Sequence, residues 1–256
     1  MSSNKTKKAL LFGLNYVNTP EVALRGCHED VRNVTNLLRS KYGFEDIDTH
    51  LDGEPGARTD ASGILQEIND LAIEAHRRHL DLVWIHFSGH GTRVRDWNHD
   101  EKDGYDEAIV PSDYKTRGLV TDDYIKRVLR NFPPCTKVIC IFDCCHSGSI
   151  ADLKYRYTDS NTRIVENTSR ACDANIVMIS GCMDTQTSAD AYNVNDRRKF
   201  SGACSSCLIK TLQREEAPTV FTVLTELRNE LRTKGFTQYP MVTSSREIAE
   251  DTKFFF

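Results

Sequence analysis

The sequence of 256 residues lacks any apolar run of the roughly 18–20 residues that a membrane-spanning helix needs. It also lacks a long run of lysine and arginine, and its formal net charge is only −4. Aromatic residues are not interleaved with basic ones, so neither a nucleic acid nor a membrane is expected as a partner. No internal repeat or low-complexity tract is visible, and the 39% of hydrophobic residues suffice for one large domain or two tightly joined halves.

Cysteine use and the N-terminal stretch both bear on the compartment. Nine cysteines are an odd number in a chain large enough to fold without disulfides, which favours reduced thiols in a cytosol-like environment. The basic residues before Ala9 superficially resemble a secretory signal. However, the apolar stretch contains Gly13 and Asn15 and leads to Pro20 without a small-residue cleavage site. We therefore expect a soluble cytoplasmic protein that has no targeting segment and is a monomer.

Apolar runs and amphipathic segments alternate along the chain. The pattern predicts strands at 9–13, 82–87, 138–142, 175–180 and 241–243, and helices at 29–42, 59–79, 122–129, 205–212 and 220–234. Apolar strands separated by amphipathic helices are typical of an α/β protein whose sheet is mainly parallel and covered on both faces. Ligand sites in such sheets lie at the carboxyl ends of the strands.

Two of the predicted strands end in residues with reactive side chains. The run 138–142 leads into Asp143, Cys144 and Cys145, and the run 82–87 leads into Ser88-Gly-His90-Gly. A free thiol has a pKa of about 8.5 and becomes an efficient nucleophile near neutrality when a cation or a helix terminus stabilises its thiolate. His90 can do this and can then protonate a leaving amine. The two motifs together predict a Cys/His dyad.

Side-chain alternation separates the two adjacent cysteines. It places Asp143 and Cys145 on one side of the strand end and Cys144 on the other. If Cys145 faces the cleft, Asp143 lines it too, and its carboxylate favours a cationic substrate side chain. The alternative is that both cysteines are small core residues, as most free cysteines are. This alternative leaves His90 in a glycine-rich turn unexplained, whereas His86 inside its apolar run is expected to be a core histidine.

Carboxylates are dense between Asp96 and Asp123. They imitate a calcium loop in part, but Glu101 stands where an EF-hand requires glycine. Composition leaves two readings open: a calcium site of another type, and a solvated charged loop. Structural zinc is disfavoured, because Cys140 lies within a predicted strand and the Cys204/Cys207 pair at the start of a predicted helix.

Taken in order, the motifs resemble those of the metacaspases, peptidases of the caspase-like clan. The matching stretches are Lys8–Tyr16, Leu24–Asp30, His86–Gly91, Asp103–Glu107, Val110–Asp113, Thr121–Asp123, Asp143–Ser149 and Ile179–Cys182. The resemblance implies a three-layer α/β/α caspase-like sandwich with a large part at 1–153, a linker at 154–172 and a small part at 173–256. The short linker resembles the type I arrangement, whereas the lack of a Pro- or Gln-rich prodomain departs from the longer relatives.

The resemblance also assigns roles by position. It makes His90 the catalytic histidine and Cys145 the nucleophile, and by analogy with the clan the backbone amides of Gly91 and Cys145 form the oxyanion hole. The primary specificity pocket would contain Asp30, Ser88 and Asp143, which implies cleavage of proteins or peptides after arginine or lysine.

Calcium dependence and self-processing are further implications. The family commonly needs Ca²⁺, and the matching carboxylates are Asp106, Asp122, Asp123 and Asp152, with Asp103 as a further candidate. Basic residues that could be self-cleavage sites lie in the polar segment after the double cysteine: Lys154, Arg156, Arg163 and Arg170. Two alternatives are a non-catalytic caspase-like scaffold that binds proteins through the same cleft and a calcium-binding module with a vestigial dyad.

Overall fold

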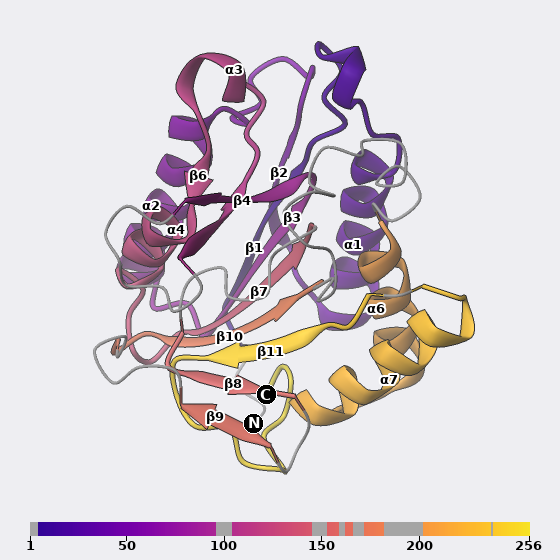
Figure 1. Ribbon diagram of the computed structural model, residues 1–256. Helices are drawn as coiled ribbons and strands as arrows, with labels where there is room; N and C mark the ends of the chain where they lie inside the picture. The colour runs from indigo at the N-terminus through magenta and orange to yellow at the C-terminus, as the bar shows by residue number, and fades with distance from the viewer. Residues whose placement is uncertain are drawn as a thin grey trace.

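The computed structural model describes residues 5–95, 104–144, 153–158, 162–165, 172–181, 202–236 and 238–256. Within these residues the main sheet has eight strands (Figure 1). Their order across the sheet is β2 (Asp46–Leu51), β1 (Lys7–Gly13), β3 (Leu82–Ser88), β7 (Lys137–Asp143), β10 (Asn175–Ser180), β11 (Met241–Ser244), β8 (Tyr155–Tyr157) and β9 (Arg163–Val165). A second sheet contains β4 (Gly91–Arg95), β5 (Tyr105–Ile109) and β6 (Val120–Thr121).

Strand direction confirms the expected α/β class. The five strands from β2 to β10 pair in parallel. The three strands beyond them, β11, β8 and β9, pair antiparallel. The sheet is therefore mainly parallel, with an antiparallel extension on one side.

Helices cover both faces of the sheet, which gives three layers (Figure 1). One face carries α1 (Cys27–Tyr42), α6 (Ala203–Arg214) and α7 (Val220–Thr233), and the other carries α2 (Ala61–Arg78) and α4 (Asp122–Leu129). Two short helical segments, a 3₁₀ turn at Pro20–Val22 and α3 (Tyr114–Arg117), lie in connections. No helix in the described ranges has the length and apolarity to cross a bilayer.

Each face of the sheet has its own hydrophobic core. Leu10 and Phe12 of β1 join one core with residues of α2 and α4. Ala9 and Leu11, which alternate with them, join the other core with residues of α1, α6 and α7. This alternation explains why the strand has no polar face, because both of its sides are buried.

Most of the apolar segments form the predicted elements, but two polar segments differ from expectation. The region 154–172, expected to be a linker, contains β8 and β9, and β8 pairs with β11 in the main sheet. Tyr157 of β8 is buried in the core against α7, so this part of the segment belongs to the sheet. The other unexpected strand, β2, lies at the opposite edge and carries mostly polar residues.

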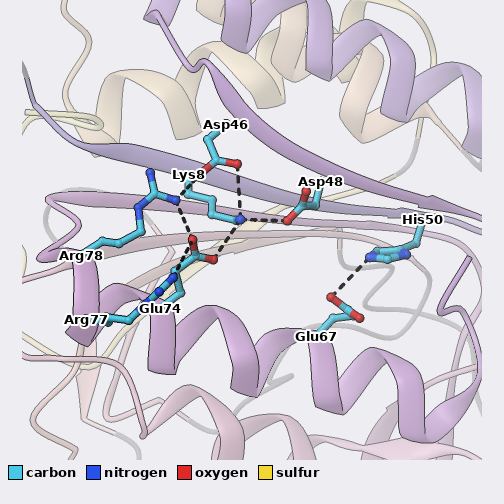
Figure 2. Close-up of polar contacts among 8 residues, drawn as sticks. All are labelled: Lys8, Asp46, Asp48, His50, Glu67, Glu74, Arg77 and Arg78. Atoms are coloured by element: carbon cyan, nitrogen blue, oxygen red, sulfur yellow. Dashed lines mark hydrogen bonds and ion pairs between the residues drawn. The ribbon is translucent and has the colours of Figure 1, made fainter.

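A cluster of charged side chains fixes β2 to the rest of the molecule (Figure 2). The Lys8 ammonium of β1 lies 3.3 Å from Asp46 and 3.0 Å from Asp48 of β2, and 2.9 Å from Glu74 of α2. Arg78 of α2 pairs with Asp46 and Glu74. Burial opposes the charge on Lys8, whose side chain is only 12% exposed, but its bonds to Glu74 and Asp48 outweigh burial and raise its pKa. The cluster joins an edge strand, its neighbour and a covering helix.

Replacing Lys8 with methionine should lower the free energy of unfolding at pH 7 by about 1–2 kcal/mol, because Asp48 then loses its ion pair and Asp46 and Glu74 keep only those with arginine side chains. Burial would raise the pKa of Asp46 and Glu74, but bonds from Arg78 and Lys8 lower it. Stabilisation from such groups is present above their unfolded pKa and is lost as pH falls through the lower folded pKa. The difference from wild type, measured by urea unfolding, should therefore shrink below about pH 4.

The control for this prediction is Lys5→Met, because Lys5 is more exposed and lies 3.6 Å from Asp81. Exposed ion pairs contribute about 0–1 kcal/mol, so this variant should unfold nearly like wild type. Equal losses in the two variants would contradict the assignment of a stabilising role to the Lys8 cluster.

The C-terminal residues Phe254 and Phe255 pack against Trp84. Phe255 stacks between Trp84, at a centroid distance of 5.9 Å, and Tyr42, at 3.9 Å. Phe254 meets the Trp84 ring edge-on at 6.2 Å. Phe256 differs, since it is 48% exposed.

We expect Phe255→Leu to lower the free energy of unfolding by about 1–2 kcal/mol, since leucine fills part of the volume but loses both stacking contacts. Phe256→Leu is the matched control and should change stability by less than about 0.5 kcal/mol. Thermal or urea unfolding of the two variants measures the difference. Equal effects would show that the tail does not pack as described.

Candidate active site

The carboxyl ends of β3 and β7 meet at one edge of the sheet. The two strands are parallel neighbours, and their last residues, Ser88 and Asp143, are paired in register. The backbone N–H of Gly89 donates to the Asp143 carbonyl at 3.4 Å. The two strand-end motifs thus begin side by side, as expected. Cys145, two residues beyond Asp143 in the sequence, lies outside the described residues.

His90 is held in place through its ring and its backbone. Its Nε2 lies 2.8 Å from the carbonyl oxygen of Val22, and the side chain is nearly buried. A carbonyl oxygen can only accept, so Nε2 carries a proton and Nδ1 is the basic nitrogen of the neutral ring. The backbone N–H of His90 donates to the Tyr16 hydroxyl at 2.8 Å, and its carbonyl accepts from Val110 N–H at 3.0 Å. The ring therefore has a fixed position and a fixed tautomer.

Two buried carboxylates, Asp30 and Asp143, lie at the same edge. Asp30, in the first turn of α1, accepts a hydrogen bond from the Ser88 hydroxyl at 2.8 Å. Asp143, which is 1% exposed, accepts one from the backbone N–H of Ser205 at 2.7 Å. Neither carboxylate forms an ion pair within the described residues, and Asp143 Oδ1 is buried there without a hydrogen-bond partner. The structure thus brings together the three residues expected in the specificity pocket.

The two carboxylates oppose each other's ionisation. Burial raises the pKa of Asp30, and the neighbouring charge of Asp143 raises it further, while the Ser88 hydroxyl acts in the other direction. Burial also raises the pKa of Asp143, against the effect of bonds from Ser205 and Cys204. A cation placed between two such groups would favour their charged forms.

The start of α6 lies against both carboxylates: Ser205 N–H bonds to Asp143, and Gly202 lies close to Asp30. Gly202 precedes the helix with a φ of +86°, and a Cβ there would lie 2.9 Å from both carboxylate oxygens of Asp30. Glycine is required both by this backbone conformation and by the close approach. The sequence did not predict the roles of Gly202 and Ser205. A glycine before a predicted helix was the available signal, but it does not indicate that the helix would contact Asp30.

His86 is a buried core residue, as expected from the sequence. Its Nε2 lies 3.2 Å from the Ser205 hydroxyl, and burial lowers its pKa to about 3. The ring is therefore neutral at physiological pH and does not serve as a cation for the acid pair.

Most of the described cysteines are buried. All seven are free thiols, of which Cys135 is exposed and Cys172 is half-buried, and Cys144 packs in one of the two cores. Burial raises the pKa of Cys27, Cys140 and Cys204, which keeps them protonated and unreactive. No group of three or more His, Cys, Asp or Glu side chains that could hold a metal occurs among the residues described.

Two of the expected calcium ligands line one cavity. Asp106 of β5 and Asp123 of α4 border a space of about 550 Å³, whose other lining residues are Thr121, Tyr124, Lys126, Arg127 and Arg130. Asp122 is buried beside it and accepts from the backbone N–H groups of Glu107 and Asp123 at 3.3 and 2.9 Å. Asp152 and Asp103 lie outside the described residues. The oxygen donors suit a hard cation, although basic side chains share the cavity.

The possible self-cleavage residues differ in their surroundings. Arg156 is the central residue of β8 and pairs with β11 on one side and with β9 on the other. Arg163 begins β9 and forms an ion pair with Glu247. Lys154 precedes β8 and is half-buried, whereas Arg170 lies outside the described residues. The peptide bonds around Arg156 are therefore the least accessible of the described candidates.

The three layers, together with a histidine and a carboxylate at two neighbouring strand ends, define a caspase-like α/β protein. The crystal structure of a Geobacter sulfurreducens protein has the same fold, with a TM-score of 0.63 and 21% identity over 97% of this chain and 99% of that one. The family description "Metacaspase, peptidase C14 domain" matches residues 7–154. The chain belongs to the metacaspases, a family of cysteine peptidases.

Relatives that match almost the whole of this chain agree with this assignment. Metacaspase-1B of Aspergillus niger is 33% identical over 94% of this chain and 65% of its own length. Metacaspase-1B of Aspergillus oryzae is 33% identical over 98% of the chain and 70% of its own length. Metacaspase-2 of Trypanosoma brucei brucei is also 33% identical, over 98% and 76%. The chain thus spans about two thirds to three quarters of the length of these relatives.

Proposed function

We propose that this protein is a calcium-stimulated cysteine endopeptidase that cleaves peptide bonds after arginine or lysine, with Cys145 and His90 as its dyad. The observation that carries the proposal is the buried pair Asp30 and Asp143 at the sheet edge from which His90 projects. The pair has two acidic groups, no ion-pair partner within the described residues and one buried, unbonded carboxylate oxygen. Such a pair suits a cationic substrate side chain, since burial is costly for an unpaired charge.

In the proposed reaction, His90 Nδ1 takes the proton of the Cys145 thiol, and the thiolate attacks the carbonyl carbon of the scissile bond. The oxygen of the tetrahedral intermediate accepts from the backbone N–H groups of Gly91 and Cys145. The imidazolium then gives its proton to the leaving amine, which leaves a thioester on Cys145. Water hydrolyses the thioester with His90 as the base.

The described contacts support this role for His90. Because Nε2–H donates to the Val22 carbonyl, the neutral ring presents Nδ1 as the base. When Nδ1 takes up a proton, the same carbonyl dipole stabilises the positive ring. The Val22 carbonyl therefore orients the His90 ring, as the aspartate carboxylate does in a Ser-His-Asp triad.

Calcium stimulation is proposed from the carboxylates around α4. Asp106 and Asp123 would hold Ca²⁺ from their shared cavity, together with Asp122 and Asp152. When bound, the ion would supply positive charge that lets these acidic side chains lie close together. Lys126 and Arg127 line the same cavity, so cation binding there competes with positive side chains.

Self-processing is proposed as a secondary activity. Among the described candidates, Lys154 fits best, because it lies outside the strands, whereas cleavage at Arg156 requires β8 to leave the sheet. Intact-mass measurement after calcium addition tests this. Fragments ending at Lys154 or Arg170 are expected, and an unchanged mass in active enzyme would contradict self-processing.

The assay that tests the proposed function uses fluorogenic peptides that differ only in having arginine, lysine or aspartate before the scissile bond. Each is incubated with the protein in calcium and in EDTA. We expect cleavage of the arginine and lysine peptides, faster in calcium, and none of the aspartate peptide. Cleavage of the aspartate peptide, or of none of the three, would contradict the proposal.

A further inference from the structure

The Tyr16 side chain contacts both the ring and the backbone of His90. Its hydroxyl accepts from the His90 backbone N–H at 2.8 Å and donates to the Val110 carbonyl at 2.8 Å. Its ring lies against the imidazole, with a centroid distance of 4.8 Å and an interplanar angle of 35°. The residue is buried, and burial raises the pKa of its hydroxyl, so the proton needed for donation is retained.

The hydrogen bonds among His90, Tyr16 and Val110 form a closed ring. Val110 N–H donates to the His90 carbonyl at 3.0 Å, while the Val110 carbonyl receives the Tyr16 hydroxyl that accepts from His90 N–H. The ladder of β4 with β5 begins one residue later, at Gly91 paired with Ile109. The Tyr16 hydroxyl therefore links the His90 N–H to the Val110 carbonyl, one residue beyond the start of the β4–β5 ladder. Both backbone polar groups of His90 are satisfied as a result.

The backbone of Tyr16 adopts a conformation that a residue with a Cβ rarely takes. Its φ is +56°, in the left-handed region. The Asp52 carboxylate holds this turn on both sides, because it accepts from Asn15 N–H at 2.6 Å and from Val17 N–H at 2.8 Å. His28 Nε2 lies 2.7 Å from the same carboxylate. An unfavourable conformation persists where the surroundings over-determine it, and such conformations cluster at functional sites.

We propose that Tyr16 is a positioning residue for His90, held in its left-handed turn by Asp52, and that its hydroxyl sets the imidazole for reaction with the thiol. This inference rests on the proposed function for the identity of the reaction. Tyr16 is not expected to touch the substrate. Its effect passes through the His90 backbone and ring, so it should alter the rate of the chemical step and leave substrate binding unchanged.

Tyr16→Phe tests the role of the hydroxyl, because it keeps the ring and removes one oxygen. The expected result is a fall in kcat of about 10- to 100-fold with KM within twofold of wild type, as expected when a reacting group is misplaced. Alkylation of Cys145 by iodoacetamide, followed by peptide mass spectrometry, should slow by a similar factor. The matched control is Tyr157→Phe, because the Tyr157 hydroxyl is also buried and accepts from Ile248 N–H at 2.8 Å.

A purely structural role would give a different result. Tyr16→Phe and Tyr157→Phe would then lower the melting temperature to similar extents, and both would keep the wild-type kcat and alkylation rate. That result would overturn the inference, as would an equal loss of kcat in the two variants. If wild type cleaves no basic peptide, the proposed function fails, but the alkylation rate still decides the role of Tyr16 because it needs no substrate.

Asp52→Asn provides a second variant in case Tyr16→Phe does not fold. The Asn15 and Val17 N–H groups bond to different oxygens of Asp52, so the amide keeps an acceptor for only one of them and places an NH2 group against the other. The alkylation rate of Cys145 should fall severalfold in folded protein. A wild-type alkylation rate in a variant whose melting temperature has fallen would overturn the inference.

Discussion

Replacing His90 with alanine is expected to reduce kcat/KM for an arginine peptide by at least about 10³-fold, and replacing Cys145 with alanine should remove cleavage altogether. The histidine serves twice in the proposed reaction, as base toward the thiol and as acid toward the leaving amine. Removing the nucleophile leaves no atom to form the thioester. Because the two residues act as a unit, the double variant should be no less active than Cys145→Ala.

The control for the dyad prediction is His76→Ala. His76 lies in the last turn of α2, and its Nε2 contacts the Asn131 carbonyl at 3.0 Å on the exposed surface. This variant should keep wild-type kcat/KM. The dyad assignment would be wrong if His90→Ala retained a tenth or more of the wild-type activity while folding normally.

The second large effect is expected from Asp143→Asn, which should lower kcat/KM for an arginine peptide by about 100-fold. Removing one partner of a buried charge pair typically costs about 2–5 kcal/mol of binding free energy. Asparagine keeps an oxygen that can accept from Ser205 N–H at the start of α6, so the helix contact is preserved. A peptide with citrulline, the neutral analogue of arginine, should be cleaved poorly by wild type and should lose little in the variant.

The same carboxylates predict a pH dependence of binding. Burial raises the pKa of both Asp30 and Asp143, so each binds a proton at a pH where an exposed aspartate is already charged. KM for the arginine peptide should therefore fall as pH rises between about 5 and 8. The unliganded protein should show the opposite trend in stability, because the folded state then binds more protons than the unfolded state and loses stability as pH rises.

Asp60→Asn is the matched control for the acid pair. Asp60 caps α2 by accepting from Gly63 N–H at 2.9 Å, and asparagine can also cap a helix. KM and its pH dependence should equal those of wild type in this variant. If Asp143→Asn cleaved the arginine peptide as well as Asp60→Asn does, the acid pair would not be the specificity pocket.

The sequence was sufficient to predict the strands that are buried on both faces, because an apolar run needs no partner to be recognised. It did not predict β2, whose carboxylates pair with Lys8 and Arg78 from elements distant in the chain. The short strand β8 was also missed, since three residues carry no periodic signal and its place depends on pairing with β11. Contacts between distant segments decide both cases.

The candidate site was predictable to a similar degree. His90 and Asp143 were placed at one sheet edge because parallel strands end together. Asp30 was placed beside them by family resemblance alone, because it lies on α1 and no local pattern joins it to Asp143. Tyr16 was not identified, since a left-handed backbone at a tyrosine leaves no signal in the sequence and the bond to His90 crosses 74 positions.

In the proposed reaction, Cys145 attacks the bond after a basic residue with the help of His90. The most direct measurement treats the protein with peptidyl chloromethyl ketones that end in arginine or aspartate and locates the adduct by mass spectrometry. We expect one adduct, on Cys145, formed rapidly with the arginine reagent, slowly with the aspartate reagent and hardly at all in His90→Ala. An adduct on another residue, or equal rates for the two reagents, would contradict the proposed reaction.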